Sequence, residues 1–567
     1  MSKDEPTPAE PDPAEVAAAL LDQARAWRDD DPDPRTRDEL DRLIVRGQGG
    51  DEGALADLAD RFVGMLQFGT AGLRGALGAG PNRMNSAVVI RAAAGLTAYL
   101  HDLVDGEPTV VVGYDARYGS KAFARDTCAV VTAAGGRALL LPRTLPTPVL
   151  AFAIRWCGAD AGVMVTASHN PPQDNGYKVY LGDGSQIVPP ADAEIAAKIA
   201  AVGSVAEVPR AEDGWQVLDD EVVDAYVAAV AALVAPDSPR ALAITHTSLH
   251  GVGDDTVRAA FRAAGFVAPA VVADQALPDP DFPTVAFPNP EEPGAIDHAL
   301  AMAQDQRSDL VIANDPDADR CAAAVLDAGA WRMLRGDEVG ALLGWHLIQR
   351  GVPQGRGFAN SIVSSRLLAA MAADAGVPHE ETLTGFKWIA RVPGLAYGYE
   401  EALGYCVAPD VVRDKDGVSA ALLLAELAAG LKTQGRGLTD VLDDLAHRHG
   451  VYLTDSFSVR VSDLSLIDVV MTRLRQAPPE RVADLPVSVI DDLAAGDGGL
   501  PPTDGVRFVL SDSSRVIVRP SGTEPKVKIY LEVIEPVTDT DLPAARARAA
   551  VRLAAIRRDF EALTAIS

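Results

Sequence analysis

Short apolar runs recur along the chain, and each is followed by a polar or glycine-rich turn and then by a helical pattern. The clearest runs lie in the segments 109–120, 241–251, 308–320 and 357–376, and another precedes the polar sequence at 166–172. Strands that alternate with helices indicate an α/β architecture with a largely parallel sheet. Because open α/β sheets bind ligands beyond the carboxyl ends of their strands, the polar turns are the candidate sites.

The two ends of the chain follow other patterns. After an acidic, proline-rich start, residues 14–28 and 35–46 have helical spacing, and the glycine-rich stretch 68–85 predicts a loop or strand–turn before a helix with Ser86 as its N-cap. Residues 513–536 have the pattern strand, tight loop, strand, and a long Ala- and Arg-rich helix closes the chain. The pattern therefore predicts three related α/β domains with mixed sheets and one C-terminal α+β domain.

The length of 567 residues also requires several domains, because a single hydrophobic core does not grow this large. We place the boundaries in polar or glycine- and proline-containing stretches. The predicted division is an N-terminal tail with helices at 1–45, domain I at 46–236, domain II at 237–327, domain III at 328–448 and domain IV at 449–567.

Charge and composition narrow the function classes. The net charge of −29 argues against non-specific binding to nucleic acid or to an anionic membrane, and an enzyme for anionic substrates would have to gather its cations in one cleft. The four cysteines have no metal-like spacing, and no run of about 18 apolar residues predicts a membrane span. The N-terminus lacks the basic start and apolar centre of a signal peptide, so we expect a cytoplasmic protein.

One candidate for chemistry is the serine at position 168, in the sequence VTASHNPPQDNGYKVY. Ser168 directly follows a predicted strand, and the Asn, Pro and Gly residues after it force a tight, exposed loop. A phosphoryl group on this serine would be reachable from a cleft, and Lys178 is close enough in sequence to fold back over it. Read alone, the loop is more typical of an inert turn than of a catalytic one.

A second candidate is the alternation of three aspartates after another predicted strand, in ANDPDADR. Asp315, Asp317 and Asp319 would fall on one side of an extended segment, and hard carboxylate oxygens suit Mg²⁺. Arg320 adds a planar fork for a phosphate. The alternative is a solvated acidic turn.

Four further segments carry residues suited to anions or sugars. RPSGTEPKVK places hydroxyls, cations and a glycine in one loop, which favours an anion-binding nest, although a plain hairpin turn has the same composition. The glycine-rich FGTAGLRG contains Arg74, TGFKWIA places Lys387 in a turn, and GYEEALGY has adjacent carboxylates that could accept sugar hydroxyls. The DKDG turn at 414–417 has no assigned role when read alone.

Together these residues describe phosphoryl transfer at a serine. A divalent ion would neutralise charge on the transferring oxygens, basic residues would hold a second phosphate, and a Lys or His would handle the hydroxyl proton. Such transfer depends on positioning and electrostatic stabilisation more than on covalent chemistry by the protein.

The motifs resemble those of the α-D-phosphohexomutase superfamily, in its order and spacing, from about residue 68 to 534. The resemblance implies four domains around a central cleft and two transfers through a sugar 1,6-bisphosphate, which also acts as activator. It also implies Mg²⁺ as cofactor and a small sugar phosphate as partner. The implied roles are Ser168, His169, Lys178, Arg74 and Arg320 at the reacting phosphoryl; Ser168, Asp315, Asp317 and Asp319 at the metal; and Lys387, Glu400, Arg519, Ser521, Gly522, Thr523 and Lys526 at the substrate.

The sugar loop departs from the pattern of enzymes that act on glucose or mannose phosphates, which carry a serine two residues after the first Glu. Here Ala402 stands at that place, and the EEALGY form looks most like the subgroup that includes phosphopentomutases and sugar-bisphosphate synthases. The resemblance favours interconversion of glucose 1- and 6-phosphates, with a phosphomannomutase or phosphopentomutase as the alternative.

Two functions of other classes remain as alternatives. A Mg²⁺-dependent sugar phosphatase would use an aspartate of DPDADR as nucleophile, and a non-catalytic sensor would bind sugar phosphates without turnover. For any of these functions we expect a monomer or weak homodimer.

Overall fold

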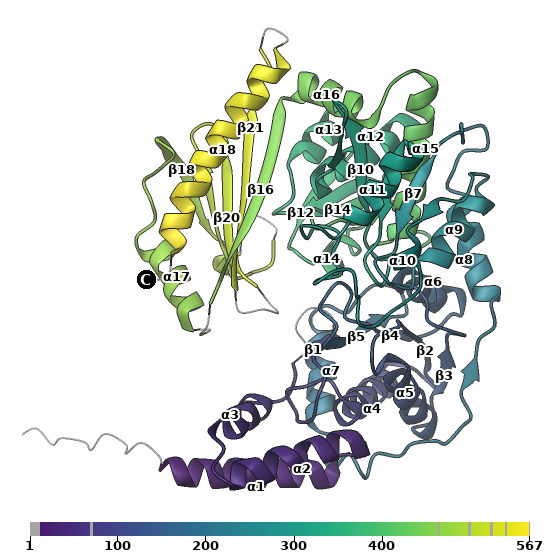
Figure 1. The fold of residues 1–567 in the computed structure, drawn as a ribbon, viewed down its shortest axis with the longest axis vertical. Coiled ribbons are helices and arrows are strands. Elements are labelled where there is room, and N and C mark those ends of the chain that lie inside the picture. Colours follow the sequence, from purple (N-terminus) through teal and green to yellow (C-terminus); the bar gives the residue numbers. More distant parts are fainter. Residues whose placement is uncertain are drawn as a thin grey trace, which may run out of the picture.

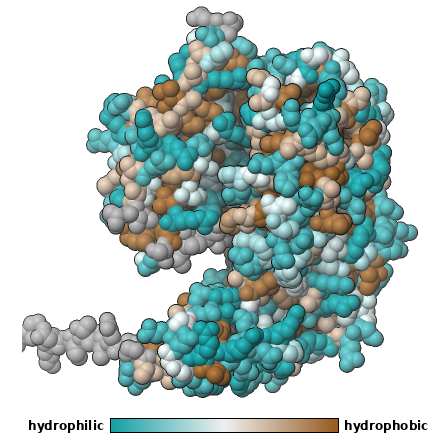
Figure 2. All heavy atoms as spheres, in the orientation of Figure 1, coloured by the Kyte–Doolittle hydropathy of each residue, from teal (hydrophilic) through white to brown (hydrophobic). Residues whose placement is uncertain are grey.

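The structure is a computed structural model that describes residues 12–67, 72–461, 463, 465–496, 500–521, 526–538 and 541–565. The chain forms four sheets, which lie along an arc with an open side (Figure 1). We call each sheet with its helices unit I to unit IV, in chain order. Figure 2 shows the surface hollowed between unit IV and unit I.

Three helices precede unit I, namely α1 (Pro13–Asp30), α2 (Pro34–Gln48) and α3 (Glu52–Arg61). Each begins after an aspartate whose side chain accepts a hydrogen bond from the first turn, because the first backbone N–H groups of a helix lack partners. The helices share a small core that includes Leu40, Ile44 and Leu58. The two predicted N-terminal helices are confirmed, and α3 was not predicted.

The sheet of unit I has the strand order β1-β5-β4-β2-β3-β6, with parallel strands on one side and antiparallel strands on the other. Its strands are β1 (Gly72–Ala76), β2 (Thr109–Tyr114), β3 (Arg137–Leu140), β4 (Ala161–Val165), β5 (Asp174–Leu181) and β6 (Gln216–Val217). Its helices are α4 (Ser86–Leu103), α5 (Ser120–Ala133), α6 (Thr147–Trp156), α7 (Ala191–Ala200) and α8 (Glu221–Ala231).

Units II and III repeat this layout with fewer strands, in the orders β11-β10-β9-β7-β8 and β13-β12-β14-β15. Unit II contains β7 (Ile244–Thr247), α9 (Asp254–Ala263), β8 (Ala270–Val271), α10 (Ala273–Ala276), α11 (Asp297–Gln306), β9 (Leu310–Ala313), β10 (Ala322–Asp327) and β11 (Ala330–Met333). Unit III contains α12 (Gly336–Arg350), β12 (Gly357–Ser361), α13 (Leu367–Ala375), β13 (His379–Thr382), α14 (Phe386–Ile389), β14 (Leu395–Glu400), β15 (Gly404–Cys406), α15 (Gly417–Thr433) and α16 (Leu438–His449).

Unit IV is an antiparallel sheet in the order β16-β21-β20-β19-β18-β17, crossed by the long helix α18 (Figure 1). Its elements are β16 (Val451–Arg460), α17 (Ser465–Gln476), β17 (Arg481–Val482), β18 (Leu485–Asp492), the 3₁₀ turn η1 (Leu493–Ala495), β19 (Val506–Leu510), β20 (Arg515–Pro520), β21 (Lys526–Glu535) and α18 (Leu542–Thr564). The structure thus has three mixed α/β units and one C-terminal α+β unit, as the sequence pattern indicated.

Two local predictions were wrong. The N-cap of α4 is Asn85, whose side chain accepts from the Val88 amide at 2.9 Å, and Ser86 is the first helical residue. Both residue types can cap, and Asn85 is one position closer to the glycine-rich loop, where its amide also donates to the Gly80 carbonyl at 2.8 Å. Lys387 lies in the short helix α14 and not in a turn.

No helix among the described residues is long and apolar enough to cross a membrane.

Candidate functional site

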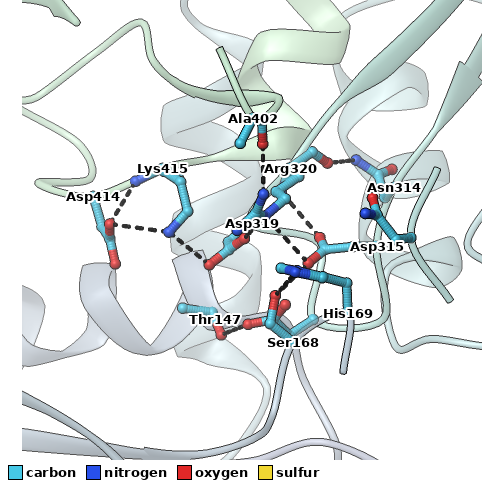
Figure 3. A network of polar contacts seen from close by, with 12 residues as sticks. Thr147, Ser168, His169, Asn314, Asp315, Asp319, Arg320, Ala402, Asp414 and Lys415 are labelled. Carbon is cyan, nitrogen blue, oxygen red and sulfur yellow. Dashed lines mark hydrogen bonds and ion pairs between the residues drawn. The ribbon is translucent and has the colours of Figure 1, made fainter. Parts of the chain in front are cut away.

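Ser168 lies in the turn that follows β4 and is buried. Its backbone has a φ of 53°, a left-handed value that is uncommon for a residue with a side chain and that clusters at functional loops. The Ser168 hydroxyl donates to Asp315 Oδ2 at 2.6 Å, and His169 Nδ1 lies 3.2 Å from the Ser168 hydroxyl oxygen (Figure 3). The structure therefore brings the loop of unit I directly against the aspartates of unit II.

The three aspartates follow β9 and are buried, and one carboxylate oxygen of each lies within 4.8 Å of the others. Asp315 accepts from the Arg320 backbone amide at 3.0 Å. Lys178, on β5 of unit I, reaches across with its amino group 2.7 Å from Asp317 Oδ2 and 2.9 Å from Asp319 Oδ2. The turn itself contains another left-handed residue, Ala318, with a φ of 53°.

Two buried oxygens of this triplet, Asp317 Oδ1 and Asp319 Oδ1, have no hydrogen-bond partner among the described residues. A buried carboxylate oxygen without a hydrogen bond costs free energy, and a bound cation would offset that cost. Hard oxygen ligands at this spacing fit Mg²⁺, which binds proteins through one or two carboxylates together with phosphate oxygens. The residues present therefore suit a divalent ion beside the serine hydroxyl.

Charge around the triplet is distributed unevenly. Burial, with Asp317 and Asp319 nearby, raises the pKa of Asp315 well above its usual range. Burial also acts to raise the pKa of Asp319, but Lys178 and Lys415 outweigh it and hold that pKa below its ordinary value. The pKa of Asp317 is lowered as well, because Lys178 outweighs the effects of burial and of Asp319, which act to raise it.

Lys415 is a site residue that the sequence analysis did not assign. It belongs to the DKDG turn of unit III, and its buried amino group lies 2.9 Å from Asp319 Oδ2 (Figure 3). The turn can come this close because the residue two positions on is Gly417, where a Cβ would lie 2.2 Å from the Arg320 carbonyl oxygen. A short charged turn beginning a helix was the only signal in the sequence.

Two arginines and the histidine complete this side of the cleft. The Arg320 guanidinium donates to the Ala402 carbonyl at 2.6 Å, which joins the aspartate loop to the sugar loop (Figure 3). Arg74, on β1, donates to Asn170 Oδ1 at 3.1 Å. Burial, with Arg320 and Arg74 nearby, lowers the pKa of His169 well below its usual value, so its imidazole is neutral at pH 7.

The candidate sugar residues occupy the unit III side. Glu400 accepts from the Gly385 amide at 2.7 Å, and burial raises the pKa of its carboxyl. Glu401 accepts from the Ser364 hydroxyl at 2.8 Å. Lys387 is not joined to the aspartates: its amino group lies 5.6 Å from the centroid of the Trp388 ring, and burial lowers its pKa.

Part of the candidate phosphate loop is placed in unit IV. Arg519 lies opposite Lys528 across β20 and β21, and the Ser521 amide donates to the Lys526 carbonyl at 2.9 Å. Burial, with the positive charges of Lys526 and Arg519, lowers the pKa of Lys528. Gly522 and Thr523 lie outside the described residues. The described part of this loop is therefore a concentration of cations, as the sequence suggested.

A segment of unit II that the sequence analysis passed over also lines the cleft. Glu291 lies in the long connection between α10 and α11 and lines a cavity of about 290 Å³ together with Glu401 of unit III and Tyr530 of unit IV. Connections of this length inside a compact unit are often functional.

Four family models match the chain in sequence order. They describe phosphoglucomutase/phosphomannomutase alpha/beta/alpha domains I, II and III at residues 65–205, 224–329 and 335–449, and the C-terminal domain at 466–549. The chain belongs to the phosphoglucomutase/phosphomannomutase family. It is an isomerase that transfers a phosphoryl group within one substrate.

Curated relatives cover most of the chain. A "Probable phosphomannomutase" of Haemophilus influenzae is 50% identical over 79% of this chain and 93% of its own length. A "Phosphopentomutase" of Homo sapiens is 35% identical over 92% of this chain and 93% of its own. A crystal structure of a phosphoglucomutase/phosphomannomutase family protein from Burkholderia thailandensis shares the fold, with 20% identity, a TM-score of 0.66 and coverage of 87% of this chain and 97% of its own.

Proposed function

We propose that this protein is a phosphosugar mutase in which Ser168 carries the phosphoryl group, with pentose phosphates as preferred substrates. The observation that supports the reaction is the contact of 2.6 Å between the Ser168 hydroxyl and Asp315, inside a buried triplet in which two oxygens accept no hydrogen bond. A serine held against a cation site is the arrangement that phosphoryl exchange requires.

Asp315, Asp317, Asp319 and the phosphate on Ser168 would hold Mg²⁺, which supplies charge neutralisation to the transferring oxygens. The chain's own cations act on the same charge. Lys178 and Lys415, which share Asp319, stay protonated, because burial is outweighed by the aspartates and the pKa of each amine is raised. Both lysines therefore serve as fixed positive charges and not as bases.

The proton of the sugar hydroxyl needs an acceptor that is unprotonated at pH 7. His169 meets this condition, since its pKa is lowered, and its Nδ1 lies 3.2 Å from the carrier oxygen. We therefore assign His169 as general base when the sugar attacks phospho-Ser168, and as general acid in the reverse transfer.

The phosphate that does not react is assigned to a clamp made of Arg519, Ser521, Gly522, Thr523 and Lys526. The reacting phosphate is assigned to Arg74 and Arg320. One clamp facing one carrier means that the bisphosphate intermediate has to turn around before the second transfer. Lys387 and Glu400 contact the sugar between the two phosphates.

The preference for pentose phosphates rests on the sugar loop. The side chain of Ala402 is only a methyl group, and its carbonyl accepts a hydrogen bond from Arg320 at 2.6 Å. A site without a hydroxyl here loses a hydrogen bond to a hexose, and a missing bond of this kind discriminates strongly between substrates. Relatives from human and yeast that cover about nine-tenths of the chain are named phosphopentomutase and phosphoribomutase.

A coupled assay tests the proposal with ribose 1-phosphate, deoxyribose 1-phosphate, glucose 1-phosphate and mannose 1-phosphate, each with a trace of the matching bisphosphate. We expect the highest kcat/KM with a pentose phosphate, and full loss of turnover in Ser168→Ala. Retention of turnover in that variant would overturn the carrier role. Release of free phosphate without isomer formation would support the phosphatase alternative instead.

A hexose phosphate mutase is the second candidate, because the 50% identical relative carries the name phosphomannomutase. A higher kcat/KM for mannose or glucose 1-phosphate in the same assay selects it. We propose a cytoplasmic monomer or weak homodimer in either case.

A further inference from the structure

The geometry points to Arg117 as a positioning residue that fixes the phosphoserine loop and aligns it with the aspartates of unit II. We propose that Arg117 sets the place of the Ser168 hydroxyl without touching substrate. This inference rests on the proposed carrier role of Ser168. Arg117 lies in the turn after β2, between the strand and α5, and is 4% exposed.

The Arg117 guanidinium donates to four backbone carbonyls of one loop. Nη2 lies 2.6 Å from the Ser168 carbonyl oxygen and also donates to the Asn170 carbonyl, while Nη1 lies 2.8 Å from the Pro171 and 3.1 Å from the Asp174 carbonyl oxygens. The loop from 168 to 174 therefore closes around one side chain. A lysine could not replace it, because a single ammonium lacks the planar fork that reaches four separate acceptors.

The loop needs such a tie because Ser168 has left-handed backbone geometry, which persists only where surrounding contacts determine it. Without the guanidinium, four carbonyl dipoles would converge on a buried site with no donor. A displacement of about 1 Å of a reacting atom is enough to lower a rate roughly a hundredfold. Arg117 therefore controls the distance between the Ser168 hydroxyl and Asp315.

Arg117 is itself held from two sides. Asp115 lies beside it, with 3.4 Å between Arg117 Nε and Asp115 Oδ2, and the Asp115 carboxylate is fixed by the Ser120 hydroxyl at 2.6 Å. From unit II, the Phe282 ring stacks on the guanidinium with its centroid 4.9 Å away. The carrier loop of unit I is thus registered against the unit that supplies the aspartates.

A matched control exists in the same unit. Arg91, on α4, also donates to two backbone carbonyls, at Val202 and Gly203, and lies over the Trp27 ring at 5.9 Å, but the loop it holds is remote from the site. The experiment compares Arg117→Lys and Arg117→Ala with Arg91→Lys and Arg91→Ala. It measures kcat and KM per folded molecule, with thermal unfolding to give the folded fraction.

For both Arg117 variants we expect kcat to fall roughly a hundredfold with KM changed less than about threefold. Methylguanidinium should restore part of the kcat of Arg117→Ala and none to Arg91→Ala. Phe282→Leu, which keeps every hydrogen bond of the guanidinium, should lower kcat by about tenfold or less and covers the case in which Arg117→Ala does not fold.

Equal kcat losses in the Arg117 and Arg91 pairs, or full activity in Arg117→Lys, would overturn the positioning role. Phosphate on Ser168, detected by mass spectrometry in the wild type, separates this outcome from failure of the proposed function. If the wild type turns over without it, the carrier role of Ser168 fails, and the role of Arg117 that rests on it fails for that reason and not because of the variants.

Discussion

Two buried clusters of charged groups join units of this protein, and they differ in how completely their carboxylate oxygens are hydrogen-bonded. In the Glu426 clamp, Oε1 accepts from the Ala235 amide at 2.8 Å and the Ser238 hydroxyl at 2.6 Å, while Oε2 lies 2.9 Å from His346 Nε2 and 3.0 Å from Arg350 Nη1. In the aspartate cluster, formed by Asp315, Asp317 and Asp319 with Lys178 and Lys415, two carboxylate oxygens accept no hydrogen bond in the described part of the chain.

The difference separates a structural cluster from a working one. Although burial acts to raise it, hydrogen bonds from His346, Ser238 and the Ala235 amide hold the pKa of Glu426 at about 2, so its charge is satisfied within the protein. In the aspartate cluster the pKa of Asp315 is instead raised, by burial first and then by the neighbouring carboxylates Asp317 and Asp319. Hydrogen bonds within the protein therefore do not fully satisfy the negative charge of this cluster, and a bound cation would do so.

The largest expected effect breaks the aspartate cluster. Asp317→Asn removes one charge and one unpartnered oxygen, and we expect kcat to fall about a thousandfold, equivalent to about 4 kcal/mol of transition-state stabilisation. Steady-state kinetics of the mutase reaction measures it. Glu426→Gln is the matched control and should keep kcat within about threefold. An Asp317→Asn enzyme with a tenth of normal turnover would show that this carboxylate is not a metal ligand.

The second largest effect is expected from a change in the Glu426 clamp. Glu426→Gln leaves His346 and Arg350 without their acceptor charge, and we expect a loss of about 3 kcal/mol in the free energy of unfolding, since a shift from 4.5 to about 2 corresponds to about 1.4 kcal/mol per pKa unit. Urea unfolding followed by fluorescence measures it, with Asp317→Asn as the control.

The same variant has a pH signature. A glutamate whose folded pKa is lowered stabilises the fold above its unfolded pKa of 4.5, and this contribution disappears as the pH falls from 4.5 to about 2. The difference in urea midpoint between wild type and Glu426→Gln should therefore be constant above about pH 5 and shrink below it. A difference that stays the same down to pH 3 would contradict the assigned pKa.

A third experiment sharpens the comparison through the ligand. Mg²⁺ at about 100 times its Kd should stabilise the wild type by about 2.7 kcal/mol, because it binds only the folded cluster. Glu426→Gln should show the same increase in Tm, and Asp317→Asn little or none. Removal of divalent ions by EDTA should abolish turnover and return the wild-type Tm to its unliganded value. Equal Mg²⁺ responses in both variants would place the cation elsewhere.

The sequence could predict the aspartate cluster but not the clamp, for a physical reason. Asp315, Asp317 and Asp319 are neighbours in the chain and follow one strand, so their proximity is local information. Glu426 meets Ala235 and His346 only through the packing of α15 against α12 and the connection between units I and II, about 190 and 80 residues away in sequence. Nothing in the local pattern of α15 marks this residue.

The same distinction runs through the candidate site. The alternation of strands and helices was sufficient for three α/β units and the α+β unit, and Ser168 and Lys178 could be proposed from one loop and its following strand. Lys415 and Glu291 reach the cleft from segments whose composition is ordinary, because their roles arise from contacts between units. Arg117 likewise meets the serine loop only through folding, since it lies 51 residues from Ser168 in sequence. The N-cap of α4 was misassigned because two adjacent residues can both cap a helix.

The smallest expected effect tests whether burial, and not charge pairing itself, separates these clusters. Lys432 and Asp309 form a pair at 2.6 Å between α15 and the start of β9, but the lysine side chain is 50% exposed. Lys432→Met should change the free energy of unfolding by less than about 0.5 kcal/mol, because water and salt screen exposed pairs. Urea midpoints at low and high salt measure it, and kcat should be unchanged. If Lys432→Met destabilised the protein as much as Glu426→Gln, complete pairing in a buried place would not be what makes the clamp strong.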